Sequence, residues 1–209
     1  MVLTVVDGEG WMADYATKCD DCGADDLARD LGAELGIDPA GIVLAATHSH
    51  ASPDFIGGWG FVPDWYMEQV TDSIRASVRD AVAAMRPAVV EYGEVLARGA
   101  NRERRDTYRS AEEQQLGWLR AYVPGTSGKG KNAGTPPEVI ATLGAYAAHP
   151  VQRGTNDGVA HPDWPGELEK ALEGRFGGVG LHFMTGLGNM SPAGPTGPAL
   201  ATLVPPVGE

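Results

Sequence analysis

A pair of histidines at the end of an apolar stretch is the first feature of this chain that could carry out chemistry. His48 and His50 stand two residues apart in the segment IVLAATHSHASPD, directly after the apolar run 42–46. In an extended backbone, residues two apart point to the same side, so both imidazoles would project together from the end of a strand. Imidazole is a common zinc ligand and transfers protons near neutral pH. A pair of solvated loop histidines is the alternative interpretation.

A third histidine occupies a similar position further along the chain. His149 follows the apolar run 143–148 and precedes Pro150, which stops a strand's hydrogen-bond ladder and turns the chain outward. Three strand-end histidines are what a zinc site at the rim of a sheet requires. Of the other two histidines, His161 lies in a predicted loop. His182 alternates with apolar neighbours and fits a structural role better than a catalytic one.

A serine in a turn-forming segment follows the last predicted strand. Ser191 lies in GLGNMSP, residues 186–192, where an exposed hydroxyl could act as a nucleophile and neighbouring amides could bind an oxyanion. The segment is not a GxSxG nucleophile elbow, because methionine precedes the serine and proline follows it. A plain turn rich in glycine and proline is the alternative.

An arginine on a loop is a further candidate for binding a substrate. Arg102, next to Asn101, could bind a carboxylate, a phosphate or an amide oxygen. It could equally be one of several surface arginines, since Arg104, Arg105 and Arg109 lie nearby.

Length and composition limit the classes of protein to which the chain can belong. With 209 residues, 43% of them hydrophobic, it can bury a sizeable core as one large domain or two small ones. A formal charge of −12 argues against nucleic acid or an anionic membrane surface as the main partner. A small-molecule substrate, including a lipid-like one bound by apolar surface, remains compatible with this charge. Oligomeric state is not indicated.

The amino terminus and the cysteines give weaker indications. The first ten residues lack a basic start and contain Asp7 and Glu9, so they predict no signal peptide and, taken literally, a cytoplasmic protein. The predicted strand 2–6 begins at the first residue, as it would if upstream sequence were missing; the protein would then be secreted or membrane-associated. No apolar stretch approaches transmembrane length. Cys19 and Cys22 form a lone CxxC, which predicts inert thiols or an incidental disulfide.

The predicted elements place these candidates at strand ends. The opening reads strand, helix, strand, which favours a parallel α/β arrangement with the functional loop at the strands' carboxyl ends. Apolar residues at three- and four-residue spacing predict a long helix after Pro63. The predicted strands are 2–6, 42–46, 88–97, 116–123, 139–147 and 179–184, and the predicted helices are 25–35, 63–85 and 165–173. From residue 192 onward, proline and glycine predict no regular structure.

Taken together, the candidate segments resemble a known family, the neutral/alkaline non-lysosomal ceramidases. Residues 46–54, ATHSHASPD, resemble the family's ATHTHSGPG segment. Four further segments resemble its motifs in the same order, and they are ANR at 100–102, AHP at 148–150, DWPG at 163–166 and GNMSP at 188–192. The resemblance implies a fold of mixed β-sheets with flanking helices, in the α/β class. Residues 1–195 would be a partial N-terminal catalytic domain, and 196–209 a Pro/Gly-rich tail.

The resemblance also implies roles for individual residues. His48 and His149 become zinc ligands, and His50 becomes a nearby polar group that helps to bind or orient the reacting amide. Arg102 becomes a substrate contact, and Ser191 becomes the nucleophile or an amide-activating hydroxyl. The implied reaction is zinc-dependent hydrolysis of the amide bond in an N-acyl sphingoid base, with Zn²⁺ polarising the carbonyl and lowering the pKa of a bound water or hydroxyl.

Departures from the family pattern leave alternatives open. The family's other two zinc ligands, a glutamate and a tyrosine, lie well beyond its Gly-x-x-Ser-Pro motif, so the sequence predicts a fragment or a shortened relative. Glu103 and Arg104 replace the Ser-Pro that usually follows Asn-Arg, and His161 is a possible substitute ligand. A non-catalytic domain that binds metal or another ligand is one alternative function. A different metallohydrolase, such as a phosphoesterase, is the other.

Overall fold

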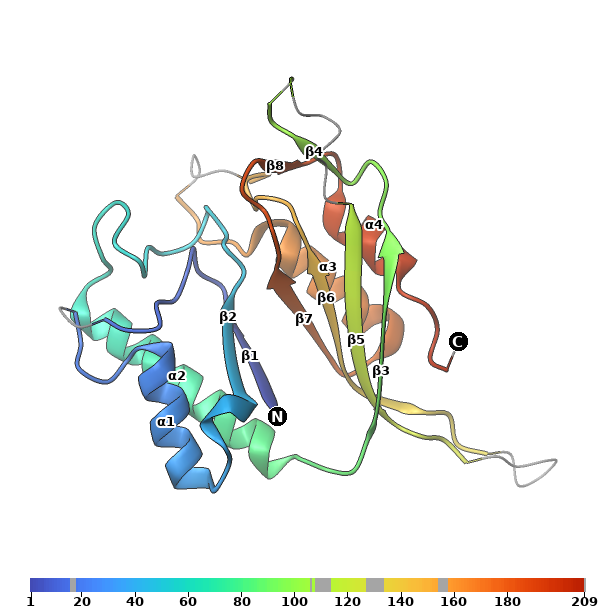
Figure 1. The fold of residues 1–209 in the computed structure, drawn as a ribbon, viewed down its shortest axis with the longest axis horizontal. Helices are drawn as coiled ribbons and strands as arrows, with labels where there is room; N and C mark the ends of the chain where they lie inside the picture. The colour runs from blue at the N-terminus through green and yellow to red at the C-terminus, as the bar shows by residue number, and fades with distance from the viewer. Residues whose placement is uncertain (16–17, 106, 108–113, 127–133, 154–157, 209) are drawn as a thin grey trace.

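The computed structural model describes residues 1–15, 18–105, 107, 114–126, 134–153 and 158–208. Arg109 therefore lies outside the described residues. The chain forms two packed units, one built on a parallel strand pair and one on a four-stranded sheet (Figure 1). None of the helices in the described ranges is long and apolar enough to cross a membrane.

The first unit confirms the predicted strand, helix, strand opening. Strand β1 (Val2–Val6) pairs in parallel with β2 (Ile42–Ala46). Between them run α1 (Ala24–Leu35) and the short 3-10 helix η1 (Pro39–Gly41). Gly36 ends α1 in the left-handed conformation with φ 68°, which glycine adopts without steric cost.

The long predicted helix closes the core of this unit. It is α2 (Asp64–Ala83), and its residues Ile74 and Val78 are buried against Leu27 and Leu31 of α1. Full burial of one such aliphatic side chain contributes about 1.5–3 kcal/mol. The apolar stripe therefore stabilises the β1–β2 pair from one side, and its role is that of a scaffold.

The second unit is a mixed sheet in the order β3-β5-β6-β7. Its strands are β3 (Val89–Leu96), β5 (Gln115–Val123), β6 (Glu138–Tyr146) and β7 (Val179–Met184). The first three are antiparallel neighbours, and β7 lies parallel to β6. The parallel step is made through α3 (Asp163–Phe176), so the carboxyl ends of β6 and β7 point to the same edge.

The last part of the chain corrects the prediction that it has no regular structure. Residues beyond 192 contain a helix, α4 (Thr196–Leu203), which packs with α3 on one face of the sheet (Figure 1). Leu200 and Val204 are fully buried there. Gly197 permits this contact, since a Cβ at its position would lie 2.5 Å from the carbonyl oxygen of Trp164. Tertiary burial of apolar side chains therefore outweighs the local preference of a Pro/Gly-rich segment.

A short third sheet lies at the rim, near the carboxyl ends of β6 and β7 (Figure 1). Strand β4 (Asn101–Glu103) pairs antiparallel with β8 (Met190–Pro192), which places Arg102 directly opposite Ser191. Asn101 is buried, and its Nδ2 donates a hydrogen bond of 2.6 Å to the carbonyl oxygen of Ala147, just after β6. The two candidate segments are thereby attached to the strand end that precedes His149.

Candidate metal centre

His48 is held at the end of β2 by the neighbouring strand's loop. Its Nδ1 lies 2.5 Å from the carbonyl oxygen of Glu9, which follows β1. The backbone at His48 is left-handed with φ 61°, an uncommon state for a residue other than glycine. The expected extended backbone is therefore wrong at this residue. Both imidazoles still point to one place, because the rings of His48 and His50 lie 5.1 Å apart at their centroids.

His149 reaches the same place from the other unit. The backbone N–H of His50 donates a hydrogen bond of 3.1 Å to the carbonyl oxygen of Pro150, which joins the loop after β2 to the loop after β6. The N–H of His149 donates to the carbonyl oxygen of Met190 at 2.9 Å. The Nδ1 of His149 lies 3.2 Å from the carbonyl oxygen of Leu187. Backbone hydrogen bonds thus fix the third histidine relative to the first two.

The three histidines form a cluster that could hold a metal ion. One ring nitrogen each from His48, His50 and His149 lies within 4.8 Å of the others. Zinc–nitrogen bonds of about 2.0–2.1 Å bring ligand atoms to roughly 3.3–3.5 Å from one another, so a small adjustment would suffice. Backbone carbonyls engage the Nδ1 atoms of His48 and His149, which leaves Nε2 available, as is usual for metal-binding histidine. The Nε2 of His50 is buried without a hydrogen-bond partner. The residues present therefore fit a metal ion.

The electrostatic environment favours neutral imidazole, the form that binds metal. Burial lowers the pKa of His50, and the positive charges of His48 and Arg104 lower it further. Burial and the charge of Arg104 also lower the pKa of His149. Both rings consequently stay neutral to lower pH than an exposed histidine.

The predicted arginine and serine lie together, but a second arginine makes the contact. Arg102 faces solvent opposite Ser191, whereas the Nε of Arg104 donates a hydrogen bond of 2.6 Å to the hydroxyl oxygen of Ser191. Sequence reasoning assigned Arg104 to the surface and missed this contact. The available signal was its spacing, because residues 102 and 104 of one extended segment point to the same side.

Glu9 is the other residue that sequence reasoning missed. Its side chain is 8% exposed, and its Oε1 lies 3.9 Å from the Nε2 of His50. Burial raises the pKa of this carboxyl group, and the nearby charge of His48 opposes the rise. The signal was the segment DGEG directly after β1, because the carboxyl ends of parallel strands meet at one edge of the sheet.

The two remaining histidines lie outside the cluster. The Nδ1 of His161 accepts a hydrogen bond of 2.8 Å from the N–H of Asp163, so this ring supports the start of α3. His182 is fully buried, with its Nδ1 2.9 Å from the carbonyl oxygen of Gly144 and its ring against Trp164. Burial lowers the pKa of His182 to about 3. Its environment is that of a core residue, in line with the predicted structural role.

A cavity of about 290 Å³ opens beside the cluster. His50 lines it together with apolar side chains, including those of Ala51, Pro53 and Val159. Trp59, 75% exposed, packs against His50, with the two ring centroids 6.2 Å apart. The site therefore joins polar ring nitrogens to apolar surface.

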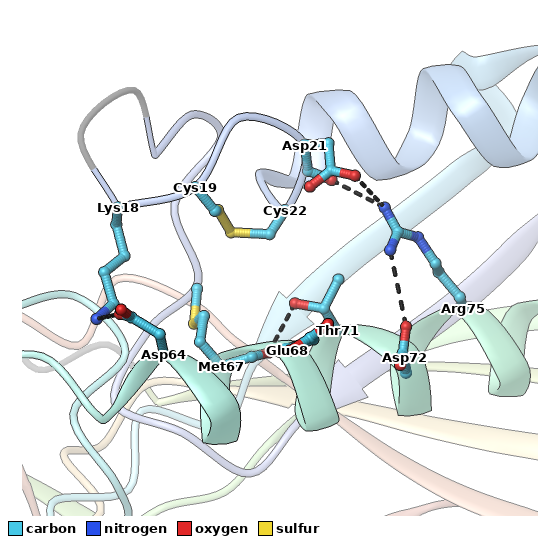
Figure 2. Close-up of a pocket in the computed structure, with 10 residues that line it drawn as sticks. All are labelled: Lys18, Cys19, Asp21, Cys22, Asp64, Met67, Glu68, Thr71, Asp72 and Arg75. Carbon is cyan, nitrogen blue, oxygen red and sulfur yellow. Dashed lines mark hydrogen bonds and ion pairs between the residues drawn. A yellow bond between two sulfur atoms is a disulfide. The ribbon is translucent and has the colours of Figure 1, made fainter.

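A second cavity of about 290 Å³ lies between the loop 18–22 and α2 (Figure 2). Cys19 and Cys22 form a disulfide in its wall, one of the two predicted states of the CxxC. Its two basic side chains form ion pairs: Lys18 pairs with Asp64, and Arg75 pairs with Asp21 and Asp72. Both basic side chains of this cavity are therefore paired with carboxylates.

Comparison with known proteins identifies the fold. No protein-family model and no curated protein matches the chain. Among solved structures, neutral ceramidase from Pseudomonas aeruginosa aligns with 96% of this chain at 18% identity and a TM-score of 0.65. A ceramidase complexed with C2 aligns with 85% at 20% identity and a TM-score of 0.61. The chain covers 34% and 32% of those two proteins, so it spans about a third of their length. The predicted mixed α/β fold of the neutral ceramidase domain is thus confirmed for part of that domain.

Proposed function

We propose that this chain carries the metal-binding part of a zinc-dependent amide hydrolase of the neutral ceramidase type. The substrate would be an N-acyl sphingoid base or a related N-acyl amide. The observation that carries the proposal is the convergence of three ring nitrogens, from His48, His50 and His149, within 4.8 Å of one another. The structural likeness to ceramidases supports the choice of reaction.

His48 and His149 are the proposed zinc ligands. The backbone carbonyls of Glu9 and Leu187 engage their Nδ1 atoms, which orients both rings and leaves Nε2 for the ion. When bound, zinc supplies Lewis-acid polarisation of a carbonyl and lowers the pKa of a coordinated oxygen. His50 has no such carbonyl partner, and its ring lines the cavity, so we assign it to binding and orienting the reacting amide.

Ser191 is the proposed nucleophile or amide-activating hydroxyl. Arg104 donates a hydrogen bond to its oxygen at 2.6 Å, and a cationic donor stabilises negative charge that develops there. The pairing of Met190 with the N–H of His149 keeps this serine next to the cluster. Arg102, exposed on the same side of β4, remains a proposed contact for the distal part of the substrate.

Apolar surface beside the cluster suits a hydrocarbon substituent. The cavity next to His50 has walls from Ala51, Pro53 and Val159, and the exposed Trp59 ring packs against His50. Ligand sites commonly combine such apolar walls with a few polar groups that fix orientation. This arrangement supports a lipid-like acyl amide over a small polar amide.

The test combines zinc analysis of the purified protein with hydrolysis of a fluorogenic N-acyl amide. We expect about one zinc per chain, lost in His48→Ala and His149→Ala, and hydrolysis lost in Ser191→Ala while zinc is retained. His161→Asn is the matched control, because it changes a nearby histidine outside the cluster and keeps an acceptor for the N–H of Asp163.

Three outcomes would contradict the proposal. Bound zinc without hydrolysis of any N-acyl amide would indicate a metal-binding module. Hydrolysis of a phosphoester that survives Ser191→Ala would indicate a phosphoesterase. Equal zinc content in wild type and both histidine variants would exclude the cluster as the metal site.

A further inference from the structure

Neighbouring rings orient the imidazole of His50, whereas backbone carbonyls orient those of His48 and His149. Its Nε2 has no hydrogen-bond partner among the described residues, and the Oε1 of Glu9, 3.9 Å away, is too far for one. The ring centroid of His50 lies 5.1 Å from that of His48, 5.4 Å from that of His149 and 6.2 Å from that of Trp59. The indole is inclined at 69° to the imidazole, an edge-to-face contact that aromatic rings prefer. Of these three neighbours, Trp59 is the one outside the histidine cluster.

One carboxylate holds the loop 54–62, which carries Trp59. The Oδ2 of Asp54 accepts a hydrogen bond of 2.7 Å from the backbone N–H of Trp59. Its Oδ1 accepts from the N–H groups of Ile56 at 3.0 Å and Gly57 at 2.8 Å. Burial alone would raise the pKa of Asp54, but the backbone hydrogen bonds outweigh burial and hold the pKa below its usual value. A charged acceptor makes stronger hydrogen bonds than a neutral one, so the backbone of Trp59 is firmly tied to this carboxylate.

Further backbone contacts give this loop a defined shape. The N–H of Val62 donates a hydrogen bond of 3.1 Å to the carbonyl oxygen of Asp54, which closes the loop. Gly57 is left-handed with φ 79°, and a Cβ there would lie 2.7 Å from the ring of Phe61, so this turn requires glycine. The loop therefore presents Trp59 in a fixed position, although the residue is 75% exposed.

From these contacts we infer that Trp59 is a positioning residue for His50 and that Asp54 acts through Trp59. The indole restricts the imidazole to the orientation in which it faces the cluster and lines the adjoining cavity. The inference rests on the proposed function, in which His50 binds and orients the reacting amide, and it adds the group that holds His50 in place. Orientation matters here because a misplacement of about 1 Å can lower a reaction rate by about 10²-fold.

The experiment compares Trp59→Ala, Trp59→Phe and Trp65→Ala with wild type in the hydrolysis of a fluorogenic N-acyl amide. We expect kcat of Trp59→Ala to fall by about 10- to 100-fold. Trp59→Phe should restore most of the loss, because a phenyl ring can make the same edge-to-face contact. Zinc content should stay at the wild-type value, since carbonyls orient His48 and His149. Trp65→Ala is the matched control: Trp65 is 65% exposed, and its ring contacts Tyr66.

A double-mutant cycle tests whether Asp54 acts through Trp59. Asp54→Asn keeps one oxygen for the N–H groups of Ile56 and Gly57 but replaces the acceptor of the Trp59 N–H by an amide nitrogen, which cannot accept. We expect kcat to fall in Asp54→Asn by no more than in Trp59→Ala, and to change little when the two are combined. Equal fold-losses of kcat from Asp54→Asn in the wild-type and Trp59→Ala backgrounds would show that Asp54 does not act through Trp59.

Relaxation of the His50 ring carbons, measured by NMR on the protein as purified, separates failure of the inference from failure of the proposed function. We expect the order parameter of this ring to fall in Trp59→Ala and to stay unchanged in Trp65→Ala. An unchanged order parameter or an unchanged kcat in Trp59→Ala would overturn the inference and leave amide hydrolysis intact. If wild type hydrolyses no N-acyl amide, the proposed function falls. The order parameter then decides alone: a fall supports the positioning of His50 by Trp59, and no change overturns it.

Discussion

Two cavities of equal volume, about 290 Å³, differ in how their polar groups are satisfied. In the cavity lined by the disulfide, Lys18 and Arg75 are bonded to acidic neighbours (Figure 2). At the cavity beside the histidine cluster, the Nε2 of His50 is buried without a partner, and the carboxylate of Glu9 accepts no hydrogen bond in the described residues.

This difference shows why cavity volume alone does not identify a functional site. Charges that pair with one another stabilise the fold and leave little for a ligand to gain. A buried polar group without a partner costs about 1–3 kcal/mol, which a ligand that completes its bonds can recover. The histidine cluster is therefore the better candidate, and changes made in both cavities test the comparison.

The largest expected effect comes from replacing Arg104, which contacts Ser191 beside the histidine cluster, and the smaller effect from replacing Arg75 in the disulfide-lined cavity. Arg104→Ala removes the hydrogen bond to Ser191, and we expect kcat for amide hydrolysis to fall by about 10²–10³-fold, the usual effect of losing one such donor. Arg75→Ala breaks the ion pairs with Asp21 and Asp72 and should leave kcat unchanged. Steady-state kinetics of both variants provides the measurement. Equal kcat in Arg104→Ala and wild type would remove the arginine from the mechanism.

A second prediction tests whether a buried ring nitrogen without a hydrogen-bond partner always marks a ligand site. The Nε2 of His182 is also buried without a partner, yet its other contacts are those of the core. Its pKa is about 3 when folded, against about 6.5 when unfolded, so the unfolded state binds the proton more tightly. The stability that this neutral ring contributes is fully present above pH 6.5 and is lost as pH falls towards 3.

The measurement for His182 is the free energy of unfolding in urea at pH 7 and pH 4.5. We expect wild type to lose about 3 kcal/mol more than His182→Gln over this interval, at about 1.4 kcal/mol per pKa unit. Because the change in unfolding free energy between the two pH values is compared, the result does not depend on whether the variant is less stable at pH 7. An equal loss of unfolding free energy in both proteins between pH 7 and pH 4.5 would show that the folded state does not resist protonation of His182. The zinc content of the two proteins should be the same.

The smallest effect is expected from the disulfide of the second cavity. Its loop is short, so Cys19→Ser with Cys22→Ser should lower the free energy of unfolding by about 2 kcal/mol or less. The zinc Kd should stay at the wild-type value. Denaturant unfolding and chelator competition on the same preparation test both statements. A loss of zinc binding as large as that of His149→Ala would mean that the two cavities are coupled.

Local sequence patterns predicted most of the fold because they reflect short-range physics. The apolar runs before His48 and His149 gave strands β2 and β6, and the spacing in α2 gave a buried stripe. The prediction that the segment after residue 192 has no regular structure was wrong, because it considered local composition alone. Its composition opposes a helix, and the helix α4 exists because Leu200 and Val204 are buried in the core.

The sequence by itself determined which side chains stand at the ends of strands: His48, His50 and His149, with Ser191 in a turn. Only the tertiary structure decided that they meet, through backbone hydrogen bonds such as that from His50 to Pro150, a hundred residues apart. It also decided that Arg104 contacts the serine and that Glu9 faces the cluster. The physical reason is that spacing fixes only the direction of a side chain from its own element. Distances between elements depend on how the two units pack.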